Sequence, residues 1–335
     1  MTFAHPTRYF ACRLSPFAAC MAIALSLAAA EPARCHAPAL GAHSLHADTT
    51  GALAVTSCAD DGGAGTLRHA VRSAKSGDVV DLGDLACDTI TLEAGAIAIS
   101  VDNLTIKGPG RDRLTIDGHG IDRIFEKSSK GTLAIEDLTI SHGRFEAAKA
   151  YGGCIYTQGS VKLTRAAVNL CAAVGSEKAV GGAIVAMGDL AMEASELSGN
   201  AIAVTAGNAD DLVGAGGAVV VGGLLAMHES TLSGNTALAA SGAVYGGGAL
   251  ASTFTAEHST LSGNQAVSAS APARGSVASG IASSATMRLL DATIEGDAAV
   301  PGAGILIGGS GFGPLVRSTI SPDAGRLAAS AVDYE

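Results

Sequence analysis

A short stretch in the first half of the chain carries side chains that could support hydrolysis or bind a metal ion. Asp112, Asp117 and Asp122 follow one another at intervals of five residues, and His119 lies between two glycines. Clustered carboxylates bind Ca²⁺, and two carboxylates can serve as acid and base around a glycosidic bond. Intervals of five, however, fit exposed turns between short strands better than one shared face. We therefore interpret His119 as a turn residue and predict no catalytic, cofactor-binding or metal-binding residues in the chain.

Other features that polysaccharide cleavage requires are sparse. The adjacent acidic pairs are Asp60-Asp61 and Asp210-Asp211. A lyase also needs an Arg or Lys that abstracts a sugar proton, and the basic residues after Lys178 are only Arg274, Arg288, Arg317 and Arg326. The absence of tryptophan and the 4% of aromatic residues leave little for the stacking that sugar-binding grooves favour. Catalysis is disfavoured and stays an alternative.

Three asparagines in the second half of the chain each end a Ser-Gly-Asn motif. Asn200, Asn235 and Asn264 each follow a Ser-Gly pair. Identical residues at the same point of successive coils can stack their amides into a hydrogen-bonded ladder, and asparagine also tolerates the left-handed turn conformation. We predict that the three residues form a structural ladder or turn rather than contact a ligand.

The elements that must position these residues recur at a period of roughly 30 residues. A Gly-Gly motif begins nine residues before an apolar position in three periods; the motifs begin at Gly152, Gly181 and Gly216, and the apolar positions are Val161, Leu190 and Leu225. Each period holds three short apolar pieces, which predicts three strands per turn and parallel pairing between turns. The expected fold is an all-β, three-sided parallel β-helix in which Leu190, Leu225 and Phe254 lie one above another.

The segment before the repeats divides by composition. Residues 1–37 have the pattern of a secretory signal peptide, with cleavage expected after Ala30 or Ala37. Residues 38–54 are predicted to be a flexible leading segment. A helical spacing predicts a capping helix over 66–76, with Thr66 as its N-cap. Such a helix would cover the open end of the first coil.

The β-helix domain is predicted to span 55–335, with degenerate final coils after 298. Ala- and Ser-rich insertions at 201–215, 236–245 and 265–279 each follow a Ser-Gly-Asn motif. They are therefore expected to lie along one edge of the solenoid. Repeat proteins place such insertions on a single face, which is often a binding face. A passive role for these insertions is the other interpretation.

Charge and cysteine content suit an exported protein. The 21 basic and 31 acidic residues give a net charge of −10. No basic cluster could neutralise phosphates, so nucleic acid is not an expected partner. Within the predicted domain the four cysteines are Cys58, Cys87, Cys154 and Cys171, an even number, as disulfides require. We favour the pairs Cys58 with Cys87 and Cys154 with Cys171, which are local along the solenoid; buried free thiols are the alternative.

The chain resembles a known family. The segment Val55 to Val71, followed by Gly77-Asp78-Val79-Val80, resembles the first motif of secreted bacterial pectate-lyase-like proteins, and 104–110 and 133–143 resemble their first coils. The Gly-Gly-Ala and Ser-Gly-Asn motifs are similar to repeats of polymorphic outer-membrane proteins. The resemblance covers about 55–297 and implies a right-handed, single-stranded parallel β-helix with a short N-terminal capping helix.

Two residues of the resembling segments carry specific expectations. Arg68 of the first motif is predicted to pair with Asp60, Asp61 or Asp78 and so to fix the cap. Gly118-His119-Gly120 resembles one element of the polygalacturonase active site, but no Arg-x-Lys element follows it.

Fold alone does not define function, and three functional hypotheses follow. The leading one is an exported, non-enzymatic surface or extracellular interaction protein of the adhesin type. We expect it to be a monomer without a stable membrane span after signal cleavage, with a glycan or a host-surface molecule as ligand. The alternatives are a polysaccharide lyase or glycoside hydrolase that acts on pectic polymers, and a passive envelope structural protein. The expected location is secreted or cell-surface, with the periplasm as an alternative.

Overall fold

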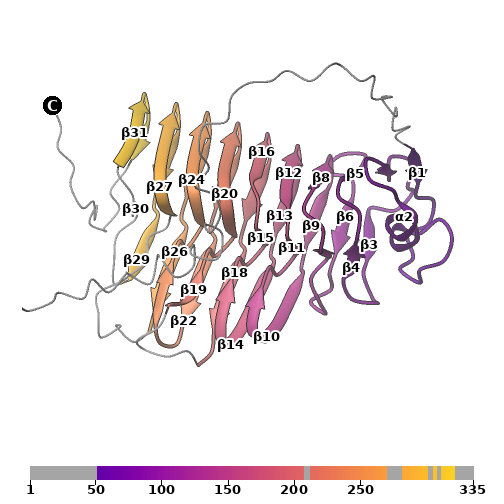
Figure 1. Ribbon diagram of the computed structural model, residues 1–335, viewed down its shortest axis with the longest axis horizontal. Coiled ribbons are helices and arrows are strands. Elements are labelled where there is room, and N and C mark those ends of the chain that lie inside the picture. The colour runs from indigo at the N-terminus through magenta and orange to yellow at the C-terminus, as the bar shows by residue number, and fades with distance from the viewer. Residues whose placement is uncertain (1–50, 207–211, 270–280, 301–304, 308–310, 321–335) are drawn as a thin grey trace, which may run out of the picture. The chain divides into compact units, whose positions relative to one another are not determined.

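The computed structural model describes residues 51–206, 212–269, 281–300, 305–307 and 311–320. The described residues are all-β, with 55% of them in strands and 3% in helix. Its parallel sheets form a β-solenoid of about eight turns (Figure 1), so the predicted fold class is confirmed. The predicted signal peptide lies outside the described residues, as do Asp210 and Asp211.

One strand of each coil belongs to a nine-stranded parallel sheet. Its strands, in spatial order, are β3 (Thr89–Thr91), β6 (Thr115–Asp117), β9 (Thr139–Ser141), β13 (Ala167–Asn169), β17 (Glu196–Ser198), β21 (Thr231–Ser233), β25 (Thr260–Ser262), β28 (Thr293–Glu295) and β32 (Thr319–Ile320). Chain order and spatial order agree, as they must when each coil stacks on the one before it.

A fifteen-stranded sheet supplies the other two sides of the tube as two columns of strands. The first column is β2 (Val79–Asp81), β5 (Leu104–Lys107), β8 (Thr132–Glu136), β12 (Ser160–Thr164) and β16 (Leu190–Glu193). The second is β4 (Ile97–Ile99), β7 (Phe125–Lys127), β11 (Ile155–Thr157) and β15 (Ile184–Ala186). The long strands β20 (Val219–His228), β24 (Ala249–Glu257) and β27 (Ile281–Leu290) run through both columns and join them, and β30 (Ile305–Ile307) and β31 (Gly311–Val316) pair with β27.

Aliphatic side chains from the three sides fill the tube. Val161 pairs with Leu190, Leu190 with Leu225, and Leu225 with Phe254, and the exposed fraction of each is at most 2%. The predicted stacking is therefore confirmed. Strand alternation explains it, because every second residue of a strand points to the same face and coils repeat at about 4.8 Å.

Strands from the insertions and from three further segments form a sheet of their own. An eight-stranded parallel sheet, low in the view of Figure 1, consists of β10 (Arg144–Tyr151), β14 (Ala172–Val180), β18 (Ala201–Val204), β19 (Leu212–Ala215), β22 (Thr236–Ala239), β23 (Ala243–Tyr245), β26 (Gln265–Ser268) and β29 (Ala298–Val300). Buried residues such as Ile202, Ala237, Val244 and Ala266 form a second apolar cluster there. The small alanine side chains thus pack a compact layer, which periodicity alone did not predict; residues 270–279 of the third insertion lie outside the described residues.

Strands are present at both ends of the described solenoid. Ala52–Ala54, placed in the flexible leading segment by the sequence analysis, forms strand β1, which pairs with β2. Without β1, the backbone N–H and C=O groups along this edge of β2 would be unpaired, and they therefore attract another strand. After 298, β30, β31 and β32 still pair in parallel with earlier coils, so the coil pattern continues to Ile320.

The capping helix α2 spans Leu67–Ser73 and is shorter than the predicted 66–76. The Thr66 side chain accepts a hydrogen bond from the backbone N of His69, as an N-cap does. Ala74 adopts an extended conformation and ends the helix. Leu67 and Val71 are buried and join the main core. The helix therefore packs its apolar face on the first coils.

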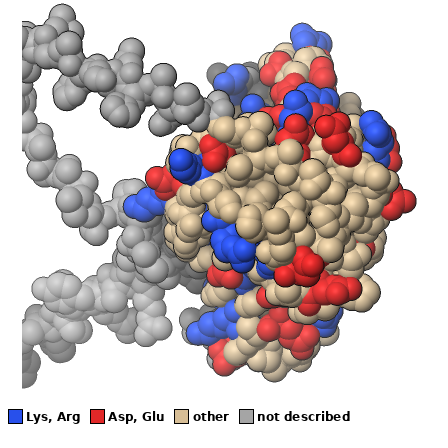
Figure 2. Space-filling view, turned by 90° about the vertical axis from the view of Figure 1, so that its right-hand side faces the viewer, with Lys and Arg blue, Asp and Glu red and all other residues tan. Residues whose placement is uncertain are grey.

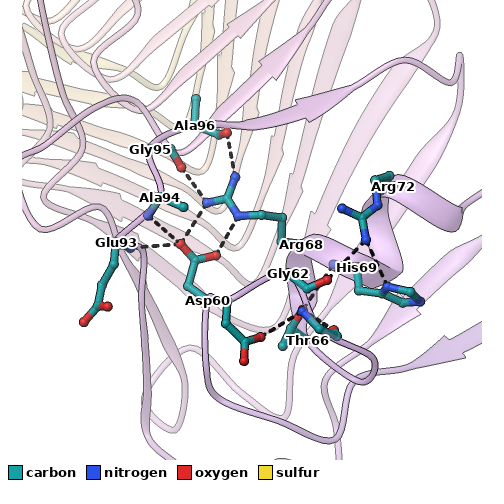
Figure 3. A network of polar contacts seen from close by, with 12 residues as sticks. Asp60, Gly62, Thr66, Arg68, His69, Arg72, Glu93, Ala94, Gly95 and Ala96 are labelled. Carbon is teal, nitrogen blue, oxygen red and sulfur yellow. Dashed lines mark hydrogen bonds and ion pairs between the residues drawn. The ribbon is translucent and has the colours of Figure 1, made fainter.

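A buried ion pair holds this cap in place (Figure 3). Arg68 Nε and Nη2 each donate to the Asp60 carboxylate at 2.8 Å, while Nη1 and Nη2 donate to the carbonyls of Ala96 and Gly95. Burial raises the pKa of the Asp60 carboxyl, but hydrogen bonds from Arg68 and from backbone amides outweigh burial and hold that pKa below its usual value. Arg68 thus pairs with Asp60 among its three predicted partners. Figure 2 views the end of the molecule that carries α2, where charged side chains of both signs surround uncharged surface.

Candidate functional site

The acidic residues and histidine singled out in the first half do not share one site. Asp112 is exposed in a turn. Asp122 accepts hydrogen bonds from the backbone N of Ala96 and of Arg123, at 3.3 and 2.7 Å. Asp117 accepts one from the backbone N of His119, at 2.7 Å. These contacts give Asp117 and Asp122 structural roles in turns.

His119 lies in a left-handed turn, with φ of 53°. In the next coil the register aligns Gly118 with His142, so His119 lies one position after the column formed by His142, Leu170, Gly199 and Gly234, whose φ values are 54°, 55°, 62° and 61°. From His142 onward, this column of turns has the same left-handed backbone conformation in successive coils. The conformation that favours glycine or asparagine explains why His119 is a turn residue.

His142 lies beside Ser141 and Asp117, so a histidine, a serine and an aspartate, the residue types of a catalytic triad, are close together. Its Nδ1 lies 3.1 Å from Asp117 Oδ2 and 3.1 Å from Ser141 Oγ. A catalytic triad uses the two nitrogens of the imidazole separately, one toward the acid and one toward the nucleophile. Here the same nitrogen contacts both, and the buried Ser141 hydroxyl donates to Asn169 Oδ1 at 2.6 Å. This arrangement cannot relay a proton from the serine to the aspartate.

Asn200, Asn235 and Asn264 lie one above another in a buried ladder. Asn200 Nδ2 donates to Asn235 Oδ1 at 3.0 Å, and Asn235 Nδ2 donates to Asn264 Oδ1 at 2.9 Å. Each Nδ2 also donates to a backbone carbonyl, and each residue is 0% exposed. Their amides bond one another and the backbone, so the ladder stabilises the stack of coils.

The ladder continues into a different residue at its C-terminal side. Asn264 Nδ2 donates to Asp297 Oδ1 at 2.9 Å, and the other carboxylate oxygen of Asp297, Oδ2, is buried without a hydrogen-bond partner among the described residues. Burial raises the pKa of the Asp297 carboxyl to about 7. At the other side, Cys171 N donates to Asn200 Oδ1 at 3.0 Å, so a disulfide cysteine occupies the preceding rung.

Two disulfides lie in the N-terminal half of the solenoid. Cys58 is bonded to Cys87, and Cys154 to Cys171, with sequence separations of 29 and 17. The first joins the segment before α2 to the first coils, and the second joins adjacent parts of one coil. Disulfides are typical of compartments outside the reducing cytoplasm.

An open groove of about 390 Å³ crosses the outer face of the large sheet. It runs over the neighbouring strands β12, β16, β20, β24 and β27, which lie side by side at the top of Figure 1. Its floor is made of outward-facing small side chains, Ala191, Ala226 and Thr255, with Lys162 at one end and Arg288 at the other. Four strand intervals separate these two cations, which places their backbones about 19 Å apart.

Ionisable side chains form one rim of the groove. Glu193 pairs in register with His228, and His228 with Glu257. His228 Nδ1 lies 3.1 Å from Glu193 Oε1. The three residues end their strands at the same side of the sheet, so consecutive coils deliver them to one line along the groove.

The turns that follow these strands add further charged groups. His258 Nε2 lies 3.4 Å from Asp291 Oδ2, and Arg317 donates to both oxygens of Asp291, at 2.6 and 2.5 Å. These hydrogen bonds from Arg317 lower the pKa of the Asp291 carboxyl. The rings of His228 and His258 meet edge to face, with centroids 5.8 Å apart.

Sequence reasoning missed the rim. Its residues are separated by about one coil each, and no short motif joins them. The only signal was the repeat, since Glu193, His228 and Glu257 each stand three residues before the Thr or Glu that opens the next short strand.

The chain matches no protein-family model, no curated protein and no solved structure with which it was compared. Among the described residues, no helix combines the length and the apolar character needed to cross a bilayer. Fold and disulfides together define the class: the chain is a disulfide-bonded parallel β-helix protein.

Proposed function

We propose that the protein is an exported, non-enzymatic interaction protein that binds an extended glycan along the groove of the large sheet. The observation that carries this proposal is the floor of Ala191, Ala226 and Thr255 between two cations. Small side chains leave room for a sugar chain to lie across several coils.

The groups around the floor suit a polyhydroxylated ligand. The exposed carboxylates of Glu193 and Glu257 can accept hydrogen bonds from sugar hydroxyls, and Lys162 and Arg288 can donate to ring, hydroxyl or carboxylate oxygens. The solenoid repeats these groups at the coil spacing, which favours a linear ligand over a compact one. The disulfides support export, and attachment to the cell surface is part of the proposal.

The test fills the groove while leaving the fold unchanged. Ala191→Arg places a long cationic side chain on the floor at an exposed position. Ala98→Arg is the matched control, because Ala98 is also an exposed alanine in a strand, on a different column of the large sheet. Both variants and the parent are screened against a glycan array. We expect Ala191→Arg to lose at least about tenfold in affinity for the glycans that the parent retains, and Ala98→Arg to bind them like the parent. Equal binding by all three proteins would refute a glycan site in the groove.

The alternatives have distinct outcomes. Release of unsaturated or reducing sugar ends from pectic polymers, abolished by His119→Ala or Asp117→Asn, would favour an enzyme. Failure of the purified protein to bind any glycan or host-matrix component would favour a passive envelope structural protein.

A further inference from the structure

We propose that His228, Glu257 and His258 form a binding site for a transition-metal ion of the Zn²⁺ class at the rim of the groove. Each of the three side chains offers a ligand atom, and these atoms lie within 4.8 Å of one another. Imidazole nitrogens with a carboxylate oxygen are a common ligand set of Zn²⁺. The inference does not rest on the proposed glycan function, since metal binding is measured without any sugar.

The side chains have the freedom to close around an ion. Zinc ligands lie about 2.0–2.2 Å from the metal, which brings them closer together than 4.8 Å. His228, Glu257 and His258 are 39%, 47% and 51% exposed, so small side-chain rotations meet no packed core. Because His228 and Glu257 also line the groove, an ion held between them would lie at its edge.

The second ring nitrogen of each histidine already has an acidic partner. Glu193 Oε1 lies 3.1 Å from His228 Nδ1, which favours the tautomer with the proton on Nδ1 and leaves the Nε2 lone pair for a metal. Asp291 Oδ2 lies 3.4 Å from His258 Nε2, which leaves Nδ1, and this nitrogen is 3.8 Å from Glu257 Oε1. Carboxylates placed in this way orient metal-binding histidines in many proteins.

The turn that holds His258 and Asp291 has equivalents in earlier coils, and these hold other residues. Asp137 and Arg165 lie at the equivalent turn position of two successive earlier coils. They form a bidentate pair at 2.6 and 2.7 Å, as Asp291 and Arg317 do in the last described coils. Between these two pairs the turn position is taken by Ala194, Glu229 and His258. His228 ends strand β20 next to Glu229, so the ligand set is local to the coils of β20 and β24 rather than a property of every coil.

The test measures Zn²⁺ binding to the tag-free, signal-cleaved protein by isothermal titration calorimetry at pH 7.5. Visible absorption of bound Co²⁺ reports coordination by nitrogen ligands in a second measurement, and Ca²⁺, which prefers oxygen ligands, is the comparison ion. The site variants are His228→Ala, His258→Ala and Glu257→Gln. His142→Ala is the matched control, because His142 is an equally exposed histidine that also contacts a carboxylate. Other histidines of the chain are present in all variants and contribute the same background.

We expect one Zn²⁺ per chain in the parent and no comparable binding of Ca²⁺. Each site variant should weaken the site at least about tenfold, Glu193→Gln should weaken it by a similar or smaller factor, and His142→Ala should leave it unchanged. Thermal melting of each variant without metal checks that the fold is intact; Glu257→Gln, which keeps the side-chain shape, is the variant least able to disturb it.

The proposal is overturned if the parent binds no stoichiometric Zn²⁺, if the site variants bind like the parent, or if His142→Ala weakens binding equally. Retained binding in His258→Ala alone would also overturn it, since it would move the ion to Glu193, His228 and Glu229, the second such group among the described residues.

Discussion

The carboxylate of Asp297 accepts two hydrogen bonds from Asn264, one from its backbone N at 2.7 Å and one from its Nδ2 at 2.9 Å. Asp297 takes the rung that asparagine occupies in the three preceding coils, but it brings an ionisable group into a buried site. The ladder therefore ties the stability of the C-terminal coils to pH.

The first prediction concerns Asp297→Asn. Because burial raises the pKa of the folded Asp297 carboxyl from 3.8 to about 7, the folded protein binds this proton more tightly than the unfolded chain. The stabilisation is fully present below about pH 4 and is lost as the pH rises toward 7; it amounts to at most about 4 kcal/mol. Urea unfolding at pH 4.5 and 8 should show the parent losing stability, relative to Asp297→Asn, at the higher pH. Asp112→Asn, an exposed control, should show no such difference. A pH-independent gap between parent and Asp297→Asn would contradict the explanation.

The second prediction concerns the middle rung of the ladder. Asn235→Ala removes the acceptor of Asn200 N and Nδ2 and the donor to the Leu197 carbonyl, all in a buried site. Unsatisfied buried groups cost about 1–3 kcal/mol each, so we expect a loss of roughly 3 kcal/mol or more in the free energy of unfolding. Gln158→Ala, which removes an exposed amide, should change it by less than about 0.5 kcal/mol. A comparable small effect of both substitutions would show that the ladder does not stabilise the fold.

The third prediction concerns the cap. Arg68→Met leaves the Asp60 carboxylate, whose side chain is 2% exposed, without its cation, and unpaired buried charges cost about 3–5 kcal/mol. Since the folded pKa of Asp60 is below its usual value, this contribution is present above about pH 4 and is lost in acid. We therefore expect a lower melting temperature at pH 7, a smaller difference at pH 3, and more oligomer in size-exclusion chromatography as the coil edge is exposed.

Arg72→Met is the matched control for the cap, because Arg72 lies exposed on the same helix. It should melt and elute like the parent. If it destabilises the protein as much as Arg68→Met, the helix rather than the ion pair is responsible.

The fourth prediction concerns the disulfides. A peptide map under non-reducing conditions should yield linked peptides that join Cys58 to Cys87 and Cys154 to Cys171. Replacing either pair by alanines should lower the free energy of unfolding by about 2–5 kcal/mol, because the cross-link restricts the unfolded chain. Free thiols at all four positions in the exported protein would contradict the pairing.

Much of the fold was predictable from residues that interact along one coil or with the next identical coil. The period, the inward positions of Leu190 and Leu225, the N-cap Thr66 and the stacking of Asn200 on Asn235 follow from local patterns, because a strand alternates its faces and a repeated coil places equal residues one above another. The sequence thus determined the fold class, the position of the cap and the ladder.

Only the tertiary structure decided which side chains meet across coils of unequal length. The step from Glu193 to His228 is 35 residues and other rungs are 29 residues apart, since insertions lengthen some coils, so no fixed spacing marks the rim. The partner of Arg68, the packing of the insertions into a sheet and the histidine cluster depend on register and loop length together. Register is set by the burial of every strand at once, which is a property of the whole stack rather than of any one segment.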